Sequence, residues 1–139
     1  MPKKANGAAP FSAEERAAMQ ELVQERRGGG QGEEAVRAKI QEMTGRDREI
    51  AEGLHALVRE LAPELQPRTW YGMPAYAREG HVLLFFQPAA KFKSRYATLG
   101  FSDKAPLDEG DFWPVTYAIQ AWTPETQAQV TQLLVRALT

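Results

Sequence analysis

The sequence predicts an α+β protein in which an antiparallel sheet carries two helices on one face. Three observations predict this class. Apolar residues recur at helical spacing before residue 62, extended segments follow one another between residues 70 and 121, and a helical pattern returns after Thr123. Strands that no helix separates pair antiparallel, and the flanking helices then cover one face of the sheet.

The composition fits one globular domain with a tail, because 43% of the 139 residues are hydrophobic and 25% are charged. A formal net charge of −1 provides no overall basic field, so we expect neither nucleic acid nor a membrane surface as a partner. The chain has no cysteine, which excludes disulfides and thiolate chemistry. The first 20 residues lack the apolar run of a signal peptide or membrane span, and we expect a cytoplasmic protein.

The first 32 residues are predicted to form an appendage to the domain at 33–139. Residues 1–10 have the composition of a frayed tail. Ser12 and Glu15 form a capping-box pattern at the start of a short amphipathic helix, and GGGQG at 28–32 is typical of a flexible linker. The pattern leaves open whether this appendage folds back onto the domain.

Three further helices are predicted within the domain. A short helix is indicated by Val36, Ile40 and Met43, and the last helix begins with Thr123 as its cap and Pro124 in its first turn. Between them lies a core helix, whose apolar residues fall on one arc. These residues are Ile50, Leu54, Leu57, Val58 and Leu61.

Three segments after residue 80 are predicted to be extended. HVLLFFQ (81–87) has the continuous apolar run of a central strand, and VTYAIQA (115–121) alternates as a half-buried strand does. In KFKSRY (91–96), an extended backbone would place Lys91, Lys93 and Arg95 on one face. Such a row either attracts an anionic partner or protects a sheet edge from strand addition, and both interpretations stay open.

The stretch TWYGMPAY (69–76) is unusual for a plain strand. Pro74 has no N–H for a sheet ladder, so it predicts an edge or a bulge, with the Met73–Pro74 bond either cis or trans. The rings either fill the core and cover a sheet face, or they wall a shallow pocket with lysines at its polar end. The candidate ligand-binding residues are Trp70, Tyr71, Tyr76, Lys91, Lys93 and Tyr96.

TWYGMPAY, followed by VLLFF and KFKSRYATLGFSD and preceded by MTGRDREIAEGLHALV, resembles the YdhG-like family of unknown function over residues 33–139. The resemblance implies a frataxin-like layout of two helices against an antiparallel sheet. Some members of that family are labelled iron chaperones. It therefore also implies ferrous iron as a possible ligand, held by carboxylates along the helix before the first strand.

The metal-ligand candidates on this helix are Glu49, Glu52 and His55. Arg48 lies four residues before Glu52 and can neutralise it, and His55 borders the apolar arc, where histidines commonly pack in the core. A second acidic group precedes Trp113 and is interpreted as a solvated loop, since its spacing matches no calcium loop. That group is Asp103, Asp108, Glu109 and Asp111.

The sequence contains no metalloprotease, P-loop or nucleophile-elbow motif and only two histidines, so we favour binding over catalysis. Three hypotheses remain. The first is delivery or buffering of ferrous iron, and the second is binding of a small anion or metabolite at the aromatic and lysine residues. The third is a protein-interaction domain that presents its open sheet face to a partner.

Overall fold

A computed structural model describes residues 10–139. Four α-helices and five strands follow one another along the chain. The helices are α1 (Ala13–Arg26), α2 (Glu33–Glu42), α3 (Gly45–Leu61) and α4 (Pro124–Leu138), with a short 3-10 helix η1 (Ala89–Phe92). The strands are β1 (Gln66–Trp70), β2 (Met73–Arg78), β3 (His81–Gln87), β4 (Ala97–Phe101) and β5 (Thr116–Ile119).

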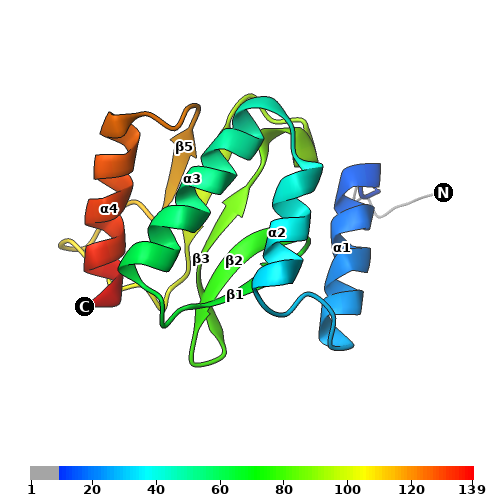
Figure 1. Cartoon of the computed structure of the whole chain (residues 1–139), viewed down its shortest axis with the longest axis horizontal. Coiled ribbons are helices and arrows are strands. Elements are labelled where there is room, and N and C mark those ends of the chain that lie inside the picture. Colours follow the sequence, from blue (N-terminus) through cyan, green and yellow to red (C-terminus); the bar gives the residue numbers. More distant parts are fainter. Residues whose placement is uncertain (1–9) are drawn as a thin grey trace.

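The strands form one sheet in the order β1-β2-β3-β4-β5, and every neighbouring pair is antiparallel. Helices α2, α3 and α4 lie on one face of this sheet, and α1 stands beside α2 at the β1 side (Figure 1). The α+β prediction is therefore confirmed. The frayed tail predicted for residues 1–10 lies, up to residue 9, outside the described residues.

The core lies between the sheet and its helices. On α3, Ile50, Leu54 and Val58 are buried as the periodicity predicts, whereas Leu61 at the end of the helix stays 37% exposed. Gly53 lets another element approach α3 closely, because a Cβ at this position would lie 2.3 Å from the indole nitrogen of Trp122. Glycine here costs helix propensity but allows the chain after β5 to pack against α3.

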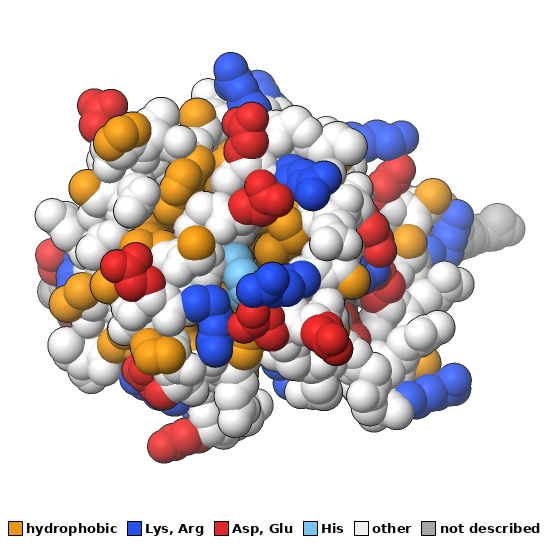
Figure 2. Space-filling view, viewed as in Figure 1, with side chains coloured by type: hydrophobic (Ala, Val, Ile, Leu, Met, Phe, Trp, Pro, Cys, Tyr) orange, Lys and Arg blue, Asp and Glu red, His pale blue; other side chains and the backbone are white. Residues whose placement is uncertain are grey.

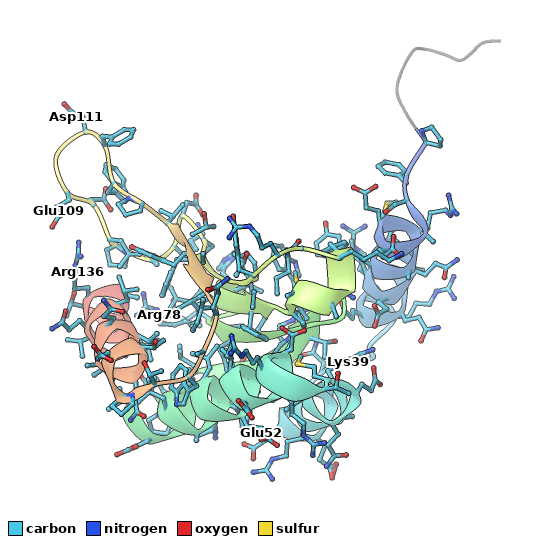
Figure 3. All side chains as sticks on the ribbon, turned by 90° about the horizontal axis from the view of Figure 1, so that it is seen from above. Lys39, Glu52, Arg78, Glu109, Asp111 and Arg136 are labelled. Carbon is cyan, nitrogen blue, oxygen red and sulfur yellow. The ribbon has the colours of Figure 1, made fainter. Side chains whose placement is uncertain are left out.

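The two faces of the sheet differ in their surroundings. Tyr76 pairs with Leu84, and both are fully buried on the helix-covered face. Phe85 points to the opposite face and lies across Gly100, where an added Cβ would be 2.3 Å from its ring. No helix of residues 10–139 lies over this second face, which is the open face of the sheet (Figure 3).

The predicted strand at 91–96 is wrong. Residues 89–92 form η1, and Lys93 has a left-handed backbone with φ of 55°. Asp47 at the start of α3 holds this turn, since its two carboxylate oxygens accept the N–H groups of Ala89 (2.9 Å) and Ala90 (3.1 Å). The hydrogen bonds that Asp47 accepts from Ala89 and Ala90 thus favour a turn over the extended backbone, and the cationic row on a strand face does not form.

Pro74 lies at a local edge although β2 is an interior strand. It pairs with Thr69 on β1, while pairing of β2 with β3 begins only at Ala75. A missing N–H is tolerated there because no β3 partner faces Pro74. The Met73–Pro74 bond is trans, as are the other peptide bonds of the described residues.

The predicted linker runs along the outer edge of β1. Thr69 donates its N–H to the Gly30 carbonyl at 2.7 Å, and Gly32 donates to the Pro67 carbonyl at 3.0 Å. Gln31 thereby forms an isolated bridge with Arg68. The backbone of 30–32 covers the edge of β1, which removes one site for strand addition. Among the described helices, none has the length and apolar character needed to span a bilayer.

Candidate functional site

The TWYGMPAY segment forms a tight hairpin. Trp70 pairs with Met73, so Tyr71 and Gly72 are the two residues of the turn. Both have positive φ, 53° and 77°, as a two-residue hairpin turn of type I′ requires. A tyrosine in the left-handed region costs on the order of 1 kcal/mol, so the surrounding contacts must stabilise this turn.

A carboxylate from α1 stabilises the turn. Glu25 Oε1 accepts the N–H of Tyr71 at 2.9 Å, and Oε2 accepts the N–H of Gly72 at 2.9 Å. The same Oε2 accepts the Thr69 hydroxyl at 2.6 Å. Glu25 is only 6% exposed, and a carboxylate is tolerated at such a depth when donors surround it. Tyr71, Gly72 and Thr69 thus form a site that binds a carboxylate group, which we call the turn site.

A second α1 carboxylate adjoins the turn site. Glu21 lies against Gly72, and an added Cβ there would be 2.2 Å from Glu21 Oε1. Its oxygens pair with Lys91 at 3.0 Å and with Lys39 on α2. Burial alone would raise the pKa of Glu21, but the bonds from Lys39 and Lys91 outweigh burial and hold this pKa below its usual value. Burial alone would lower the pKa of Lys39, but Glu21 raises it.

Three acidic side chains of helix α1 contact the domain. Besides Glu21 and Glu25, Glu14 pairs with Lys93 at 3.2 Å. Val23, in contrast, is 48% exposed, and of the apolar residues of α1 only Ala18 is fully buried. The helix predicted from the capping box is present, and the Ser12–Glu15 box is formed. Its attachment includes ion pairs and hydrogen bonds from Glu14, Glu21 and Glu25.

The predicted aromatic pocket does not form. Trp70 lies on the open face, edge-on to Tyr71 at a ring-centroid distance of 4.9 Å and near Phe85 at 5.2 Å. Tyr76 is fully buried on the other face, against the helices. The two-residue turn separates Trp70 from β2, so counting alternation straight through 70–76 put both rings on the same face. Of the predicted ligand-binding residues, Tyr71 and Lys91 do lie at the turn site.

Tyr96 and Lys93 lie elsewhere. Tyr96 follows the η1 turn, with the Arg95 guanidinium 5.1 Å from its ring centroid. It lines a separate hollow of about 300 Å³ beside Asp47 and Ile119. Lys93 is largely exposed and engaged by Glu14. Neither residue lines a pocket together with Trp70, because the backbone between β3 and β4 turns at η1 and is not extended there.

His55 of α3 packs beneath the sheet. Its Nδ1 lies 2.8 Å from the Tyr76 hydroxyl, and burial lowers the pKa of its imidazole while burial raises that of the Tyr76 phenol. Within residues 10–139, His55 Nε2 has no hydrogen-bond partner and lies 3.9 Å from Glu33. Acidic and basic side chains intermingle over α2 and α3 on this face (Figure 2).

The predicted metal ligands are not gathered. Glu49 is exposed, Glu52 pairs with Arg48 at 3.2 Å, and His55 is turned to Tyr76. Figure 3 shows Glu52 on α3 and Glu109 and Asp111 on the distant loop before β5. Within residues 10–139, no three His, Asp or Glu side chains lie close enough to hold a metal ion. Iron binding therefore stays a prediction from the resemblance.

Four of the side chains that meet at the turn site, Glu25, Glu21, Thr69 and Lys39, were not among the sequence candidates. Glu25 and Glu21 lie in the segment that was separated from the domain, and Thr69 and Lys39 belong to other elements. Two signals were present. Gly72 lies between two extended runs, where a glycine indicates a turn, and acidic residues at positions 14, 21 and 25 fall on one helix face.

Comparison with known proteins found no matching family model, curated protein or solved structure for this chain. The likeness to the YdhG-like family thus rests on the residues that suggested it.

Proposed function

We propose that the turn site binds small carboxylate-bearing molecules and that α1 occupies this site from within the chain. The observation that carries the proposal is the capture of Glu25 by three donors, the N–H groups of Tyr71 and Gly72 and the Thr69 hydroxyl. Backbone N–H groups in a turn and a hydroxyl are the donors that proteins use to hold anions.

The neighbouring lysines extend this argument to ligands with two acidic groups. Lys39 and Lys91 come from different elements and converge on the Glu21 carboxylate. Both α1 carboxylates abut Gly72, so a compact dicarboxylate has donors for each end. Hollows of about 480 Å³ and 260 Å³ flank these groups, the first between α1 and α2 and the second beside Lys91.

The weak apolar contribution of α1 supports competition by a free ligand. Because α1 is tethered, its carboxylates have an effective concentration in the millimolar range, and a free anion must compete with them. Screening by salt weakens exposed ion pairs such as Lys93–Glu14, which further favours exchange. This proposal specifies the small-anion hypothesis and moves its polar centre from a strand face to the hairpin turn.

The test uses the full chain with Glu21→Gln and Glu25→Gln combined, and glutarate as the probe. We expect saturable shifts of the Tyr71 and Gly72 amide resonances, with affinity about tenfold or more above that of the unmodified chain because the internal competitor is weakened. The matched control adds Thr69→Val and Lys91→Met, which removes one hydroxyl donor and one cation. Shifts that are absent in the first variant, or that persist in the control, contradict the proposal.

A further inference from the structure

The two edge strands of the sheet, β1 and β5, differ in whether another segment covers them. The backbone of 30–32 covers β1, as described above. At the other end, β5 has β4 as its one neighbouring strand in the part of the chain that the structure describes. Phe101 donates to the Val115 carbonyl at 2.8 Å, so the alternating ladder directs the backbone groups of Tyr117 inward. Those of Thr116 and Ala118 are directed outward, and within residues 10–139 they have no hydrogen-bond partner.

A groove follows this bare edge. It has a volume of about 370 Å³ and runs between β5 and α4. Tyr117, Ile119, Val130 and Leu133 supply its apolar lining, and glutamines supply much of the remainder. Thr116 and Ala118 are exposed beside it. The edge carries no lysine, proline or bulge of the kind that commonly prevents strand addition.

This region is depleted of charge. From Phe112 to Val135 the chain has one charged residue, Glu125, although a quarter of the whole chain is charged. Figure 2 shows the surface over α4 as mostly uncharged, in contrast to α2 and α3. Depletion of charged residues distinguishes the buried parts of interfaces from other protein surface.

We propose that the β5 edge and α4 bind a second copy of this chain across a two-fold axis. Antiparallel pairing of β5 with β5 of the second copy would satisfy the outward backbone groups of Thr116 and Ala118 in both chains. The surface is self-complementary because an uncharged patch meets itself without like-charge repulsion. The two sheets then continue as one sheet across the axis.

The charges at the two ends of α4 fit this symmetry. Glu125 lies in the first turn of α4 and Arg136 in the last. A two-fold axis across α4 sets the two helices antiparallel, so Glu125 of one copy faces Arg136 of the second copy. Arg136 donates a hydrogen bond to the Leu107 carbonyl at 2.9 Å and lies 3.8 Å from Glu109 of its own chain, with its side chain 43% exposed. A parallel arrangement would instead bring like charges together.

The test measures the molar mass of the full chain by sedimentation equilibrium. We expect a reversible dimer in the unmodified protein. Ala118→Pro removes the outward N–H and should raise the dimer dissociation constant by about tenfold or more. Gln132→Lys places like charges across the axis and should do the same without touching the strand. Gln41→Lys, an equal charge change on the exposed side of α2, is the control and should leave the dimer unchanged.

A charge exchange tests the antiparallel arrangement of α4 separately. Glu125→Arg alone and Arg136→Glu alone should each weaken the dimer, and the two changes together should restore it. An unmodified chain that stays monomeric at all concentrations overturns the proposal. A dimer that Ala118→Pro and Gln132→Lys leave intact overturns it as well, because the contact then lies elsewhere.

Discussion

The carboxylate of Glu25, in the N-terminal helix, accepts the backbone N–H of Gly72 at 2.9 Å, in a turn 47 residues further along the chain. This contact joins the segment before the glycine linker to the hairpin that begins the sheet. The hairpin turn therefore acts both as a structural element and as a carboxylate site.

Replacing Glu25 with alanine should release α1 from the hairpin. The change leaves the N–H groups of Tyr71 and Gly72 without their acceptor, and hydrogen bonds to a charged group contribute about 2 kcal/mol each. In urea unfolding, we expect the free energy of unfolding to fall by about 2 kcal/mol for each of these hydrogen bonds. Hydrogen exchange at the two amides should become faster. Glu34→Ala, at an exposed α2 position, is the control. Unchanged exchange at both amides would refute the role of Glu25.

Gly72→Ala should be more damaging than Gly80→Ala. Both glycines have positive φ, 77° and 83°, so each substitution carries backbone strain of about 1 kcal/mol. Only at position 72 does the new methyl group meet another side chain, the Glu21 carboxylate. The free energy of unfolding should therefore fall further for Gly72→Ala. In a double-mutant cycle this excess should disappear with Glu21→Ala, and an excess that survives would place its cause elsewhere.

Attachment of α1 should depend on pH through Glu21 and Lys39. The pKa of Glu21 is lowered on folding, so its contribution is present above its usual pKa of 4.5 and is lost as the pH falls through the lower folded value. The pKa of Lys39 is raised, so its contribution is complete below 10.5 and is lost as the pH rises through the higher folded value. We expect hydrogen-exchange protection of α1 to decline on both limbs.

Two single variants separate these limbs. Glu21→Gln should flatten the acid limb, because the titrating carboxyl is gone. Lys39→Met should flatten the alkaline limb and leave acid sensitivity in place. An acid limb of unchanged steepness in Glu21→Gln would assign the dependence to another carboxyl group.

His55 should make the domain less stable on mild acidification. Its pKa is lowered by burial, so below its usual pKa of 6.5 the unfolded chain binds the proton more readily than the folded chain does. The free energy of unfolding should then fall as the pH decreases from 6.5, until the folded His55 is itself protonated. His55→Asn should remove this slope, whereas His81→Asn, at an exposed position, should preserve it. A slope that follows His81 would contradict the assignment.

The fold class was predictable because it depends on periodicity. The burial of Ile50, Leu54 and Val58 on α3 follows from their spacing, and the buried run of β3 follows from its apolar sequence. Helix α1 was predictable as well, since the Ser12–Glu15 capping box is a local interaction. These features depend on residues within a few positions of one another, which the order of the sequence records directly.

The site was decided by contacts between distant segments. The extended pattern of 91–96 is overridden because Asp47, more than forty residues away, accepts the N–H groups of η1. The faces of Trp70 and Tyr76 depend on a turn that interrupts the count between them. Periodicity carries no information on where α1 attaches, because two of the three donors to Glu25 are backbone N–H groups, which every sequence possesses. The chain order thus determined the helices, most of the strands and the class, and tertiary packing alone determined which carboxylate meets which turn.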